Sequence, residues 1–277
     1  MMRQDLKSIL YNILGGIIVS ILTAILIYLR HKCRHFHLQR LLGFILKPEI
    51  DAKIVYGQLT LPPVHNINGQ VISHPFVKPP RNGGALPLQG TYSITHPISE
   101  CEVRASSYLT SMLSSSGNTQ PNIVSDADAN ALLDCNLFTL GGPGSNYKTA
   151  DILASSANIF IRMSHNGFSL ISAEALPFVC DQTTDYGFIL RITPNQFPKR
   201  SWIACAGLGE WGTSGSAWFL SNKWRQLLLT IYPFAYYIGF MPIPDFVAIV
   251  KVTRGQDQSA DIVALYRRSG KKLKNVK

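Results

Sequence analysis

The feature that most constrains this chain is an uncharged apolar run close to its N-terminus. No Asp, Glu, Lys or Arg lies between Lys7 and Arg30, and the run from Ile9 to Leu29 reads ILYNILGGIIVSILTAILIYL. At about 1.5 Å per helical residue, a run of this length crosses the roughly 30 Å hydrocarbon core of a membrane. It is longer than the apolar part of a secretory signal and lacks a small-residue cleavage site. We therefore predict an uncleaved transmembrane anchor over residues 1–30.

The charges that flank this run predict its orientation. Arg3 and Lys7 precede it, and four basic residues follow it closely: Arg30, Lys32, Arg34 and Arg40. Because the more positive flank stays on the cytoplasmic side, we expect a single-pass protein of the cell membrane with residues 30–277 in the cytoplasm. The five cysteines are odd in number, scattered and free of paired spacing, as is typical of a reducing compartment.

The positive charge of the chain lies at its two ends. The formal net charge is +10, yet residues 51–266 hold 13 basic and 14 acidic residues. A nucleic-acid partner is therefore disfavoured. An apolar fraction of 46% with 15% charged residues also excludes a disordered chain and a disulfide scaffold. We expect a basic juxtamembrane segment over residues 31–50, a cytoplasmic domain over 51–266 and a basic C-terminal tail over 267–277.

Small residues recur along one face of the anchor. Gly16, Ser20 and Ala24 lie four residues apart, a spacing that lets two membrane helices approach closely. This pattern predicts self-association through the anchor. The alternative is that small residues are simply common in membrane-spanning helices.

The juxtamembrane segment carries two further patterns. His37–Lys47 reads HLQRLLGFILK and places four apolar residues on one helical face, which predicts a helix lying in the membrane interface: Leu38, Leu41, Leu42 and Ile45. His and Cys alternate between His31 and His37, but side chains two residues apart on a helix diverge and do not converge on one ion. No metal site is therefore assigned.

The cytoplasmic domain alternates short apolar runs with helical patterns. A capping box, Ser99-Glu100-Cys101-Glu102, opens a helix in which Glu102 is expected to reach back to the free N–H groups of the first turn. A second helix is expected from Thr213 to about Leu229, and residues 226–244 are expected to form a buried helix and a loop rather than a second span. The expected strands are 54–59, 122–125, 136–140, 158–164, 167–172, 185–193, 201–206, 245–253 and 261–266.

This alternation predicts an α/β fold. Continuous apolar strands separated by helices favour a Rossmann-like, mostly parallel sheet. Asn166-Gly167 predicts a hairpin, and the last two strands are expected to form an antiparallel hairpin at the sheet edge. The sheet is therefore expected to be mixed, preceded by one transmembrane helix.

The most informative motif is WIACAGLGEWGTSGS over residues 202–216. Gly207, Gly209 and Gly212 satisfy G-x-G-x-x-G between an apolar strand and a helix, where backbone N–H groups can receive an anionic ligand. Thr213 or Ser214 is expected to cap the helix and reach a phosphate oxygen. The acid that a dinucleotide site needs about 20 residues later is missing, and a purely structural glycine turn remains the alternative.

A second glycine loop follows another strand. Gly141 and Gly142 come directly after the strand 136–140, with Ser145 or Asn146 as the cap of the next helix. If the two strands are parallel neighbours, both loops open at the same sheet edge, where α/β proteins bind their ligands. Neither loop has the Gly-Lys-Ser/Thr ending of an ATP-hydrolysing P-loop.

Three other side chains are candidates for ligand contact. Glu210 and Trp211 lie inside the first glycine loop, where the indole ring is expected to stack on a base or to plug the domain core. Asp126 follows the strand 122–125, where a carboxylate can bind a metal ion or a ribose. No nucleophile and base can be paired from the sequence, so no catalytic residue and no cofactor is assigned.

The basic tail is expected to stay solvated or to be attracted to anionic lipid, since the membrane and the tail lie on the same side. Five of its six basic residues are expected to make this contact: Arg267, Arg268, Lys271, Lys272 and Lys274. Nucleic acid is the alternative partner.

Three functions remain open. The favoured one is a membrane-anchored sensor or effector that binds a nucleotide-like or phosphorylated ligand; its architecture resembles that of membrane-anchored bacterial signalling and defence effectors. The second is a membrane-tethered hydrolase or transferase acting on a nucleotide or nucleotide-sugar, with Glu210 or Asp126 as the acid or base. The third is an interaction scaffold with no small-molecule ligand.

Overall fold

The computed structural model describes residues 2–43, 52–59, 97–115, 121–129, 134–164, 167–171, 178–233, 243–269 and 272–276, together with four short strands between residues 64 and 92. The helices are α1 (Met2–Leu42), α2 (Glu100–Ser115), α3 (Tyr147–Ala154), α4 (Glu210–Asn222) and α5 (Trp224–Ile231). The strands of the main sheet are β1 (Ala52–Tyr56), β6 (Asn122–Ser125), β7 (Asn136–Leu140), β10 (Thr184–Ile192), β11 (Trp202–Gly207), β12 (Phe246–Thr253), β13 (Gln256–Ser269) and β14 (Lys272–Asn275). Three separate hairpins pair β2 (Val64–His65) with β3 (Val71–Ile72), β4 (His74–Lys78) with β5 (Leu88–Tyr92), and β8 (Ile161–Ser164) with β9 (Gly167–Leu170).

The main sheet is mixed, with the order β14-β13-β12-β10-β11-β7-β1-β6. From β6 to β11 the neighbouring strands are parallel, and from β11 to β14 they are antiparallel. The α/β class and the mixed sheet are thus confirmed. After β1 the chain passes through α2 to β6 on one side of β1, and then crosses to β7 on the other side. The connections therefore change direction between β1 and β7, which is where open α/β sheets bind ligands.

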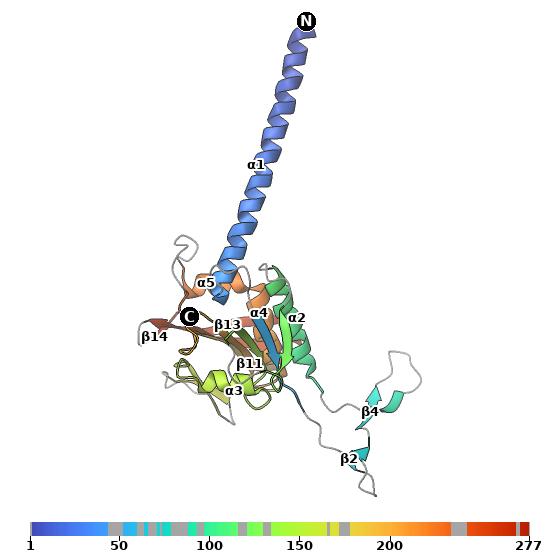
Figure 1. The fold of residues 1–277 in the computed structure, drawn as a ribbon, viewed down its shortest axis with the longest axis vertical. Coiled ribbons are helices and arrows are strands. Elements are labelled where there is room, and N and C mark those ends of the chain that lie inside the picture. Colours follow the sequence, from blue (N-terminus) through green and yellow to red (C-terminus); the bar gives the residue numbers. More distant parts are fainter. Residues whose placement is uncertain are drawn as a thin grey trace.

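Two hydrophobic cores cover the two faces of this sheet. Alternation along the strands separates them: Phe138 and Leu140 of β7 pack with α2, α4 and α5, whereas Leu137 packs with α3 and the β8–β9 hairpin. In Figure 1, α2, α4 and α5 lie on the α1 side of the sheet and α3 on the other side. Strands buried on both faces account for the unbroken apolar runs in the sequence.

Several expected elements have different positions in the structure. The strands 122–125 and 136–140 occur as expected. The expected hairpin of β8 and β9 also occurs, but β8 begins at Ile161 rather than at residue 158, and the strand expected at 54–59 is β1, which ends at Tyr56. The helix expected from Thr213 begins earlier, at Glu210, and the chain breaks at Lys223 into α4 and α5. The last hairpin does not end the sheet, because β12 is an inner strand and β14 forms the edge. Residues 234–242 lie outside the described residues.

The end of α1 is part of the body. Leu38, Leu41 and Leu42 are at most 2% exposed and belong to the core on the α5 side of the sheet. The prediction that this face lies in the membrane interface is therefore wrong for these three leucines, and Ile45 lies outside the described residues. The same amphipathic spacing suits a protein core and a membrane surface, and here the body supplies the apolar partner.

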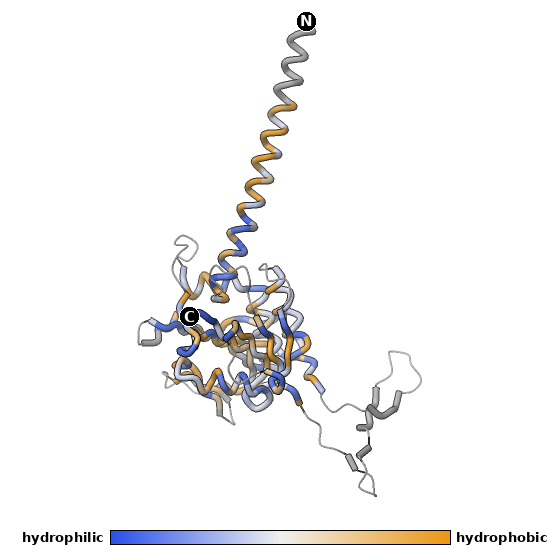
Figure 2. The backbone as a smooth tube through the Cα atoms, in the orientation of Figure 1, coloured by the Kyte–Doolittle hydropathy of each residue, from blue (hydrophilic) through white to orange (hydrophobic). Residues whose placement is uncertain are grey.

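The rest of α1 extends away from the body as a single exposed helix. The part of α1 between Ile13 and Leu42 contains a segment long and apolar enough to cross a membrane, and 18 consecutive residues of it have a mean hydropathy of 2.2. Figure 2 shows its apolar residues outside the body, and Leu26 is 68% exposed. An apolar surface of this length needs a nonaqueous environment or a partner.

Residues of the basic tail continue the sheet. Residues 267–269 end β13, and residues 272–275 form β14, which pairs with it. The Arg268 guanidinium forms an ion pair of 3.2 Å with Asp245 and donates to the Ala157 carbonyl. Arg267 donates to the Ile231 carbonyl at the end of α5. Lys271 lies outside the described residues.

Candidate functional site

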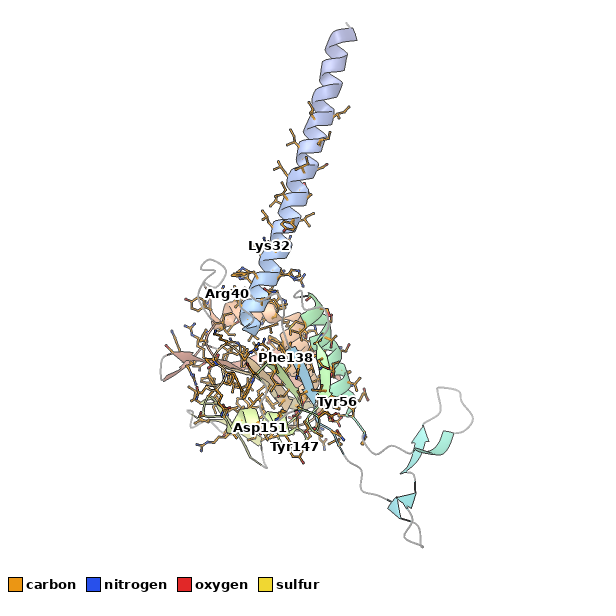
Figure 3. All side chains as sticks on the ribbon, viewed as in Figure 1. Lys32, Arg40, Tyr56, Phe138, Tyr147 and Asp151 are labelled. Carbon is orange, nitrogen blue, oxygen red and sulfur yellow. The ribbon has the colours of Figure 1, made fainter. Side chains whose placement is uncertain are left out.

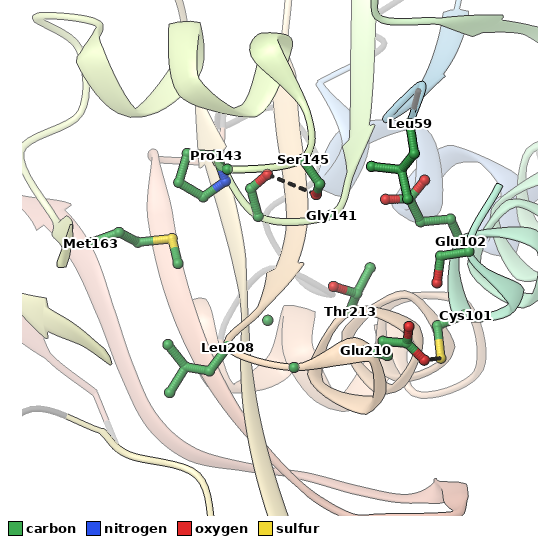
Figure 4. A pocket seen from close by; sticks show the side chains of 15 residues that line it. Leu59, Cys101, Glu102, Gly141, Pro143, Ser145, Met163, Leu208, Glu210 and Thr213 are labelled. Atoms are coloured by element: carbon green, nitrogen blue, oxygen red, sulfur yellow. Dashed lines mark hydrogen bonds between the residues drawn. The ribbon is translucent and has the colours of Figure 1, made fainter. Parts of the chain in front are cut away.

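A cleft of about 720 Å³ opens at the carboxyl ends of three parallel strands. It is formed by the segments that follow β1, β7 and β11, together with the start of α2 and the start of α4, as Figure 4 shows. The lining residues are Leu59, Ser99, Cys101, Glu102, Gly141, Gly142, Pro143, Gly144, Ser145, Met163, Gly207, Leu208, Gly209, Glu210 and Thr213. Both glycine loops expected from the sequence therefore meet in one cleft, because β7 and β11 are parallel neighbours.

The loop after β7 is held by the side chain that caps α3. Asn146 is the N-cap residue of α3, and its Oδ1 accepts hydrogen bonds from the backbone N–H groups of Lys148 and Thr149. Its Nδ2 donates to the carbonyls of Val55 at 3.0 Å and Leu140 at 2.8 Å. Asn146 is 1% exposed. It thus fixes the ends of β1 and β7 to α3 and does not face the cleft.

Asp126 has a similar positioning role. Its Oδ1 accepts a hydrogen bond from the Gln58 N–H, and its Oδ2 accepts one from the Tyr147 N–H, each at 2.8 Å. Asp126 and Asn146 therefore engage three backbone N–H groups in the first turn of α3. These are the donors that would otherwise receive an anion at a helix N-terminus.

The loop after β11 contains a carboxylate from within the protein. Asp185, which is fully buried at the start of β10, accepts hydrogen bonds from the N–H groups of Gly209 at 3.1 Å and Gly212 at 2.9 Å. The Asp185 carboxylate occupies the position beside the N-terminus of α4 where the glycine motif predicts a phosphate group. The cap of α4 is Gly209, which has no side chain of its own to satisfy these donors.

The glycines of this loop are required by close packing. A Cβ atom on Gly207 would lie 2.5 Å from the Thr213 nitrogen, and one on Gly209 would lie 2.5 Å from the Asp185 carboxylate. Gly144, in the other loop, has nothing within 4 Å of its Cβ position. Open space is therefore left at Gly144, whereas Gly141 of the same loop has a positive φ of 90° and a Cβ atom on it would meet the Glu102 carboxylate.

Two glutamates face the cleft from neighbouring helices. The Glu102 carboxylate accepts a hydrogen bond of 3.1 Å from the Gly57 N–H beyond the end of β1, instead of the first-turn role that the capping box predicts. Burial raises the pKa of Glu102 to about 7, against the opposing effect of the Gly57 hydrogen bond, and the charges of Asp126 and Glu210 add to the rise. Glu102 therefore holds its proton near neutral pH in an appreciable fraction of molecules.

Cys101 lies beside Glu210. The Cys101 Sγ is 3.5 Å from Glu210 Oε2, in a geometry in which the thiol donates. Burial raises the pKa of the Cys101 thiol to about 11. A thiol in this state is a hydrogen-bond donor rather than a thiolate nucleophile at neutral pH.

The polar side chains that line the cleft are acidic or uncharged. Glu102 and Glu210 contribute its carboxyl groups, Ser99, Ser145 and Thr213 its hydroxyls, and no Lys or Arg is among the described residues that line it. Leu208 and Met163 form an apolar wall across the cleft from Glu102 (Figure 4). Such a lining is expected to bind ligand groups that donate hydrogen bonds or carry positive charge more tightly than it binds a phosphate group.

Seven of the twelve predicted binding residues line this cleft: Gly141, Gly142, Ser145, Gly207, Gly209, Glu210 and Thr213. The five that do not are Asp126, Asn146, Trp211, Gly212 and Ser214. Thr213 and Ser214 lie within α4 rather than at its cap.

Trp211 and Ser214 belong to a polar cluster between α2, α4 and β13. The Arg104 guanidinium lies 4.4 Å from the centre of the Trp211 ring. Asp257 accepts hydrogen bonds from Ser214 Oγ at 2.5 Å and from Arg104 Nε and Tyr108 Oη at 3.0 Å each. Trp211 therefore packs against the domain, which was the alternative to stacking on a base.

Sequence reasoning did not predict eight of the fifteen residues that line the cleft: Leu59, Ser99, Cys101, Glu102, Pro143, Gly144, Met163 and Leu208. Of these, Ser99 and Glu102 carried a helix-cap signal, and Pro143, Gly144 and Leu208 lie inside the two glycine loops. Strand β1 and helix α2 are separated by more than forty residues of sequence, so the Gly57–Glu102 contact depends on the tertiary fold.

The chain matches no known family model, and no curated protein is detectably similar to it in sequence. Within the described residues, no three His, Cys, Asp or Glu side chains form a group that could hold a metal ion.

Proposed function

We propose that this is a single-pass membrane protein whose Rossmann-like body binds a nucleotide-like small molecule in the cleft and acts as a sensor or effector. The observation that carries the proposal is the meeting of the segments after β1, β7 and β11 in one cleft of about 720 Å³. The cleft lies at the change of direction between β1 and β7, and its volume is in the range of ordinary ligand sites.

The lining supports recognition of the nucleoside part of such a ligand. Glu102 and Glu210 can accept hydrogen bonds from ribose hydroxyls or base amino groups, and protonated Glu102 can also donate one. Leu208 and Met163 offer apolar contact to a planar base. The N–H groups that would hold a phosphate are engaged by Asp126, Asn146 and Asp185, so we place the phosphates of the ligand at the mouth of the cleft.

The position of the cleft supports a ligand that comes from the aqueous phase. Tyr56 ends β1 and Tyr147 follows the loop after β7, and both lie on the side of the body away from Arg40 and the rest of α1 (Figure 3). With α1 in the membrane, the cleft faces away from the lipid. The distribution of flanking positive charge supports a cytoplasmic body.

The test is a thermal-shift screen of the full chain in detergent against mono-, di- and cyclic nucleotides, NAD, nucleosides and nucleotide-sugars. A ligand at about one hundred times its Kd adds about 2.7 kcal/mol to the free energy of unfolding. Gly144→Leu is the blocking variant, because the Cβ position of Gly144 is open. Lys251→Leu, at an exposed position of β12, is the matched control.

Gly144→Leu is expected to abolish the ligand shift while Lys251→Leu retains it. Substitutions at Gly207 or Gly209 do not serve this purpose, since their Cβ atoms would meet backbone or Asp185 and unfold the loop. A panel without any shift for a folded chain would instead favour an interaction scaffold.

The pair Glu102 and Glu210 favours a second candidate, a hydrolase or transferase acting on a nucleotide or nucleotide-sugar. Protonated Glu102 would give its proton to the leaving group as the glycosidic bond breaks, and Glu210 would take a proton from the attacking water or acceptor hydroxyl. Turnover of a ligand found in the screen, lost in Glu102→Gln with binding retained, would establish the enzyme.

A further inference from the structure

Two parts of the chain that are far apart in sequence meet where α1 enters the body. The last turns of α1 pack with α5 in one core, through Leu38 and Leu41 on α1 and Leu227 and Leu228 on α5. Figure 1 shows α5 beside the base of α1, on the side of the body from which the apolar part of α1 extends. This surface of the body therefore faces whatever surrounds α1.

The charged residues in and around these two helices are all basic. Residues 30–47, which contain the end of α1, and residues 211–244, which contain α5, together hold seven Lys or Arg residues and not a single Asp or Glu. Over the rest of the body, basic and acidic residues are mixed. Arg30, Lys32 and Arg34 on α1 and Arg225 on α5 are exposed. Leu229, one turn after Arg225, is 43% exposed.

The length of α1 sets the distance of this surface from the membrane. The uncharged run ends at Leu29, and the first leucine of α1 in the core of the body is Leu38, nine residues later. At 1.5 Å per residue this is about 13 Å. The headgroup layer accounts for roughly 5–7 Å of that distance, and the remaining gap is within the Debye length of about 8 Å at physiological salt.

We propose that the ring of charge made by Arg30, Lys32 and Arg34 around α1, together with Arg225 and Leu229 of α5, binds anionic lipid headgroups. These five residues are here called the collar surface. The inference rests on the proposed membrane anchor. It moves the lipid contact away from the C-terminal tail, where Arg267 and Arg268 are engaged by Ile231, Asp245 and Ala157.

Charge complementarity is the reason for choosing lipid as the partner. The inner leaflet is negatively charged and attracts clusters of Lys and Arg beside a membrane helix. A protein partner would need to fit into the gap of about 6–8 Å that is left between the body and the headgroups. The collar surface would hold the body in one orientation on the bilayer, with the cleft directed to the aqueous side.

The experiment uses the full chain in vesicles of phosphatidylcholine alone or with phosphatidylglycerol, both with a nitroxide quencher on the headgroups. A fluorophore is attached at Gln226→Cys, an exposed position on α5, in a background with Cys33→Ser and Cys180→Ser. The control fluorophore is attached at Asp151→Cys on α3, on the other side of the sheet. Vesicle flotation reports membrane insertion separately.

We expect stronger quenching at position 226 in anionic vesicles than in neutral ones, and little quenching at position 151 in either. Arg225→Glu should lower the population of the quenched orientation at least about fivefold, since one basic residue near an anionic surface corresponds to about 1 kcal/mol. Arg162→Glu, on β8 away from the collar surface, should leave it unchanged.

Equal quenching at position 226 in neutral and anionic vesicles would overturn the role of the collar surface. So would an equal decrease of this quenching in Arg225→Glu and Arg162→Glu. Protection of position 226 that depends on protein concentration and not on lipid charge would show a second copy as its partner and overturn it too. Failure of the chain to float with vesicles would overturn the anchor itself, which distinguishes the two proposals.

Discussion

The carboxylate of Asp185 accepts a hydrogen bond of 2.9 Å from the Gly212 N–H in the first turn of α4. A buried side chain of β10 thus supplies the negative charge that the positive end of a helix favours. The glycine motif of residues 207–212 is needed for this contact, because Gly212 also packs against the Tyr186 backbone. Close packing of α4 against two strands explains the motif, and the members of residues 207–212 that line the cleft are Gly207, Leu208, Gly209 and Glu210.

Asp185→Asn is expected to lower the free energy of unfolding by about 2 kcal/mol. The amide keeps the shape of the side chain but removes the charge and presents an N–H group to donors that need an acceptor. Urea unfolding of the full chain in detergent measures the change. Asp261→Asn, an exposed carboxylate on β13, is the control and should change stability by less than about 0.5 kcal/mol. Equal effects of the two changes would contradict the role assigned to Asp185.

Glu102 is expected to make the stability of the protein depend on pH. Its pKa is about 7 in the folded protein against 4.5 for an ordinary glutamate. Between these values the folded protein holds a proton that the unfolded chain has lost, so the free energy of unfolding falls as the pH rises. The expected loss is of the order of 2 kcal/mol from about pH 4.5 to about pH 7.5.

Glu102→Gln should remove this dependence, since the amide has no proton to lose and its oxygen can still accept the Gly57 hydrogen bond. Unfolding curves at both ends of the pH range measure it. Glu100→Gln is the matched control, because the Glu100 side chain is 83% exposed and lies one turn from Arg104 on the same helix. If Glu102→Gln keeps the slope of the unmodified chain, the carboxyl group does not titrate as described.

Leu41→Ala is expected to destabilise the body by about 3 kcal/mol, because Leu41 is 1% exposed within the core on the α5 side. Leu26→Ala, in the exposed apolar part of α1, should leave the unfolding of the body almost unchanged. Urea unfolding followed by tryptophan fluorescence distinguishes the two. An unchanged midpoint for Leu41→Ala would show that the end of α1 is not part of the body.

The elements of the sheet could be predicted from the sequence where a short apolar run stands between turn residues. Strands β6 and β7 are examples. The parallel pairing of β7 with β11 brings the loops after these two strands together, as expected. These features depend on local patterns and on the geometry that all parallel sheets share.

The remaining parts of the site depend on contacts between distant residues. The start of α4 at Glu210 could not be predicted, since the carboxylate at its N-terminus comes from Asp185 on another strand. Glu102 matched a helix-cap pattern but lies against Gly57. The leucines at the end of α1 have a spacing that suits either a membrane or a protein core, and only the fold decides between the two.

The face of α1 that contains Gly16, Ser20 and Ala24 gives a test of self-association. The Ser20 hydroxyl donates to the Gly16 carbonyl at 2.8 Å within the helix, so the face is small and its polar group is satisfied. Gly16→Leu should place a large side chain in the path of a second helix and raise the dissociation constant at least about tenfold. Gly15→Leu is the matched control, because both glycines have open Cβ positions and Gly15 points about 100° away around the helix. Energy transfer between labelled copies of the full chain in vesicles measures the association. Equal association of both variants with the unmodified chain would contradict packing through this face, and equal loss would assign the effect to the added bulk rather than to the face.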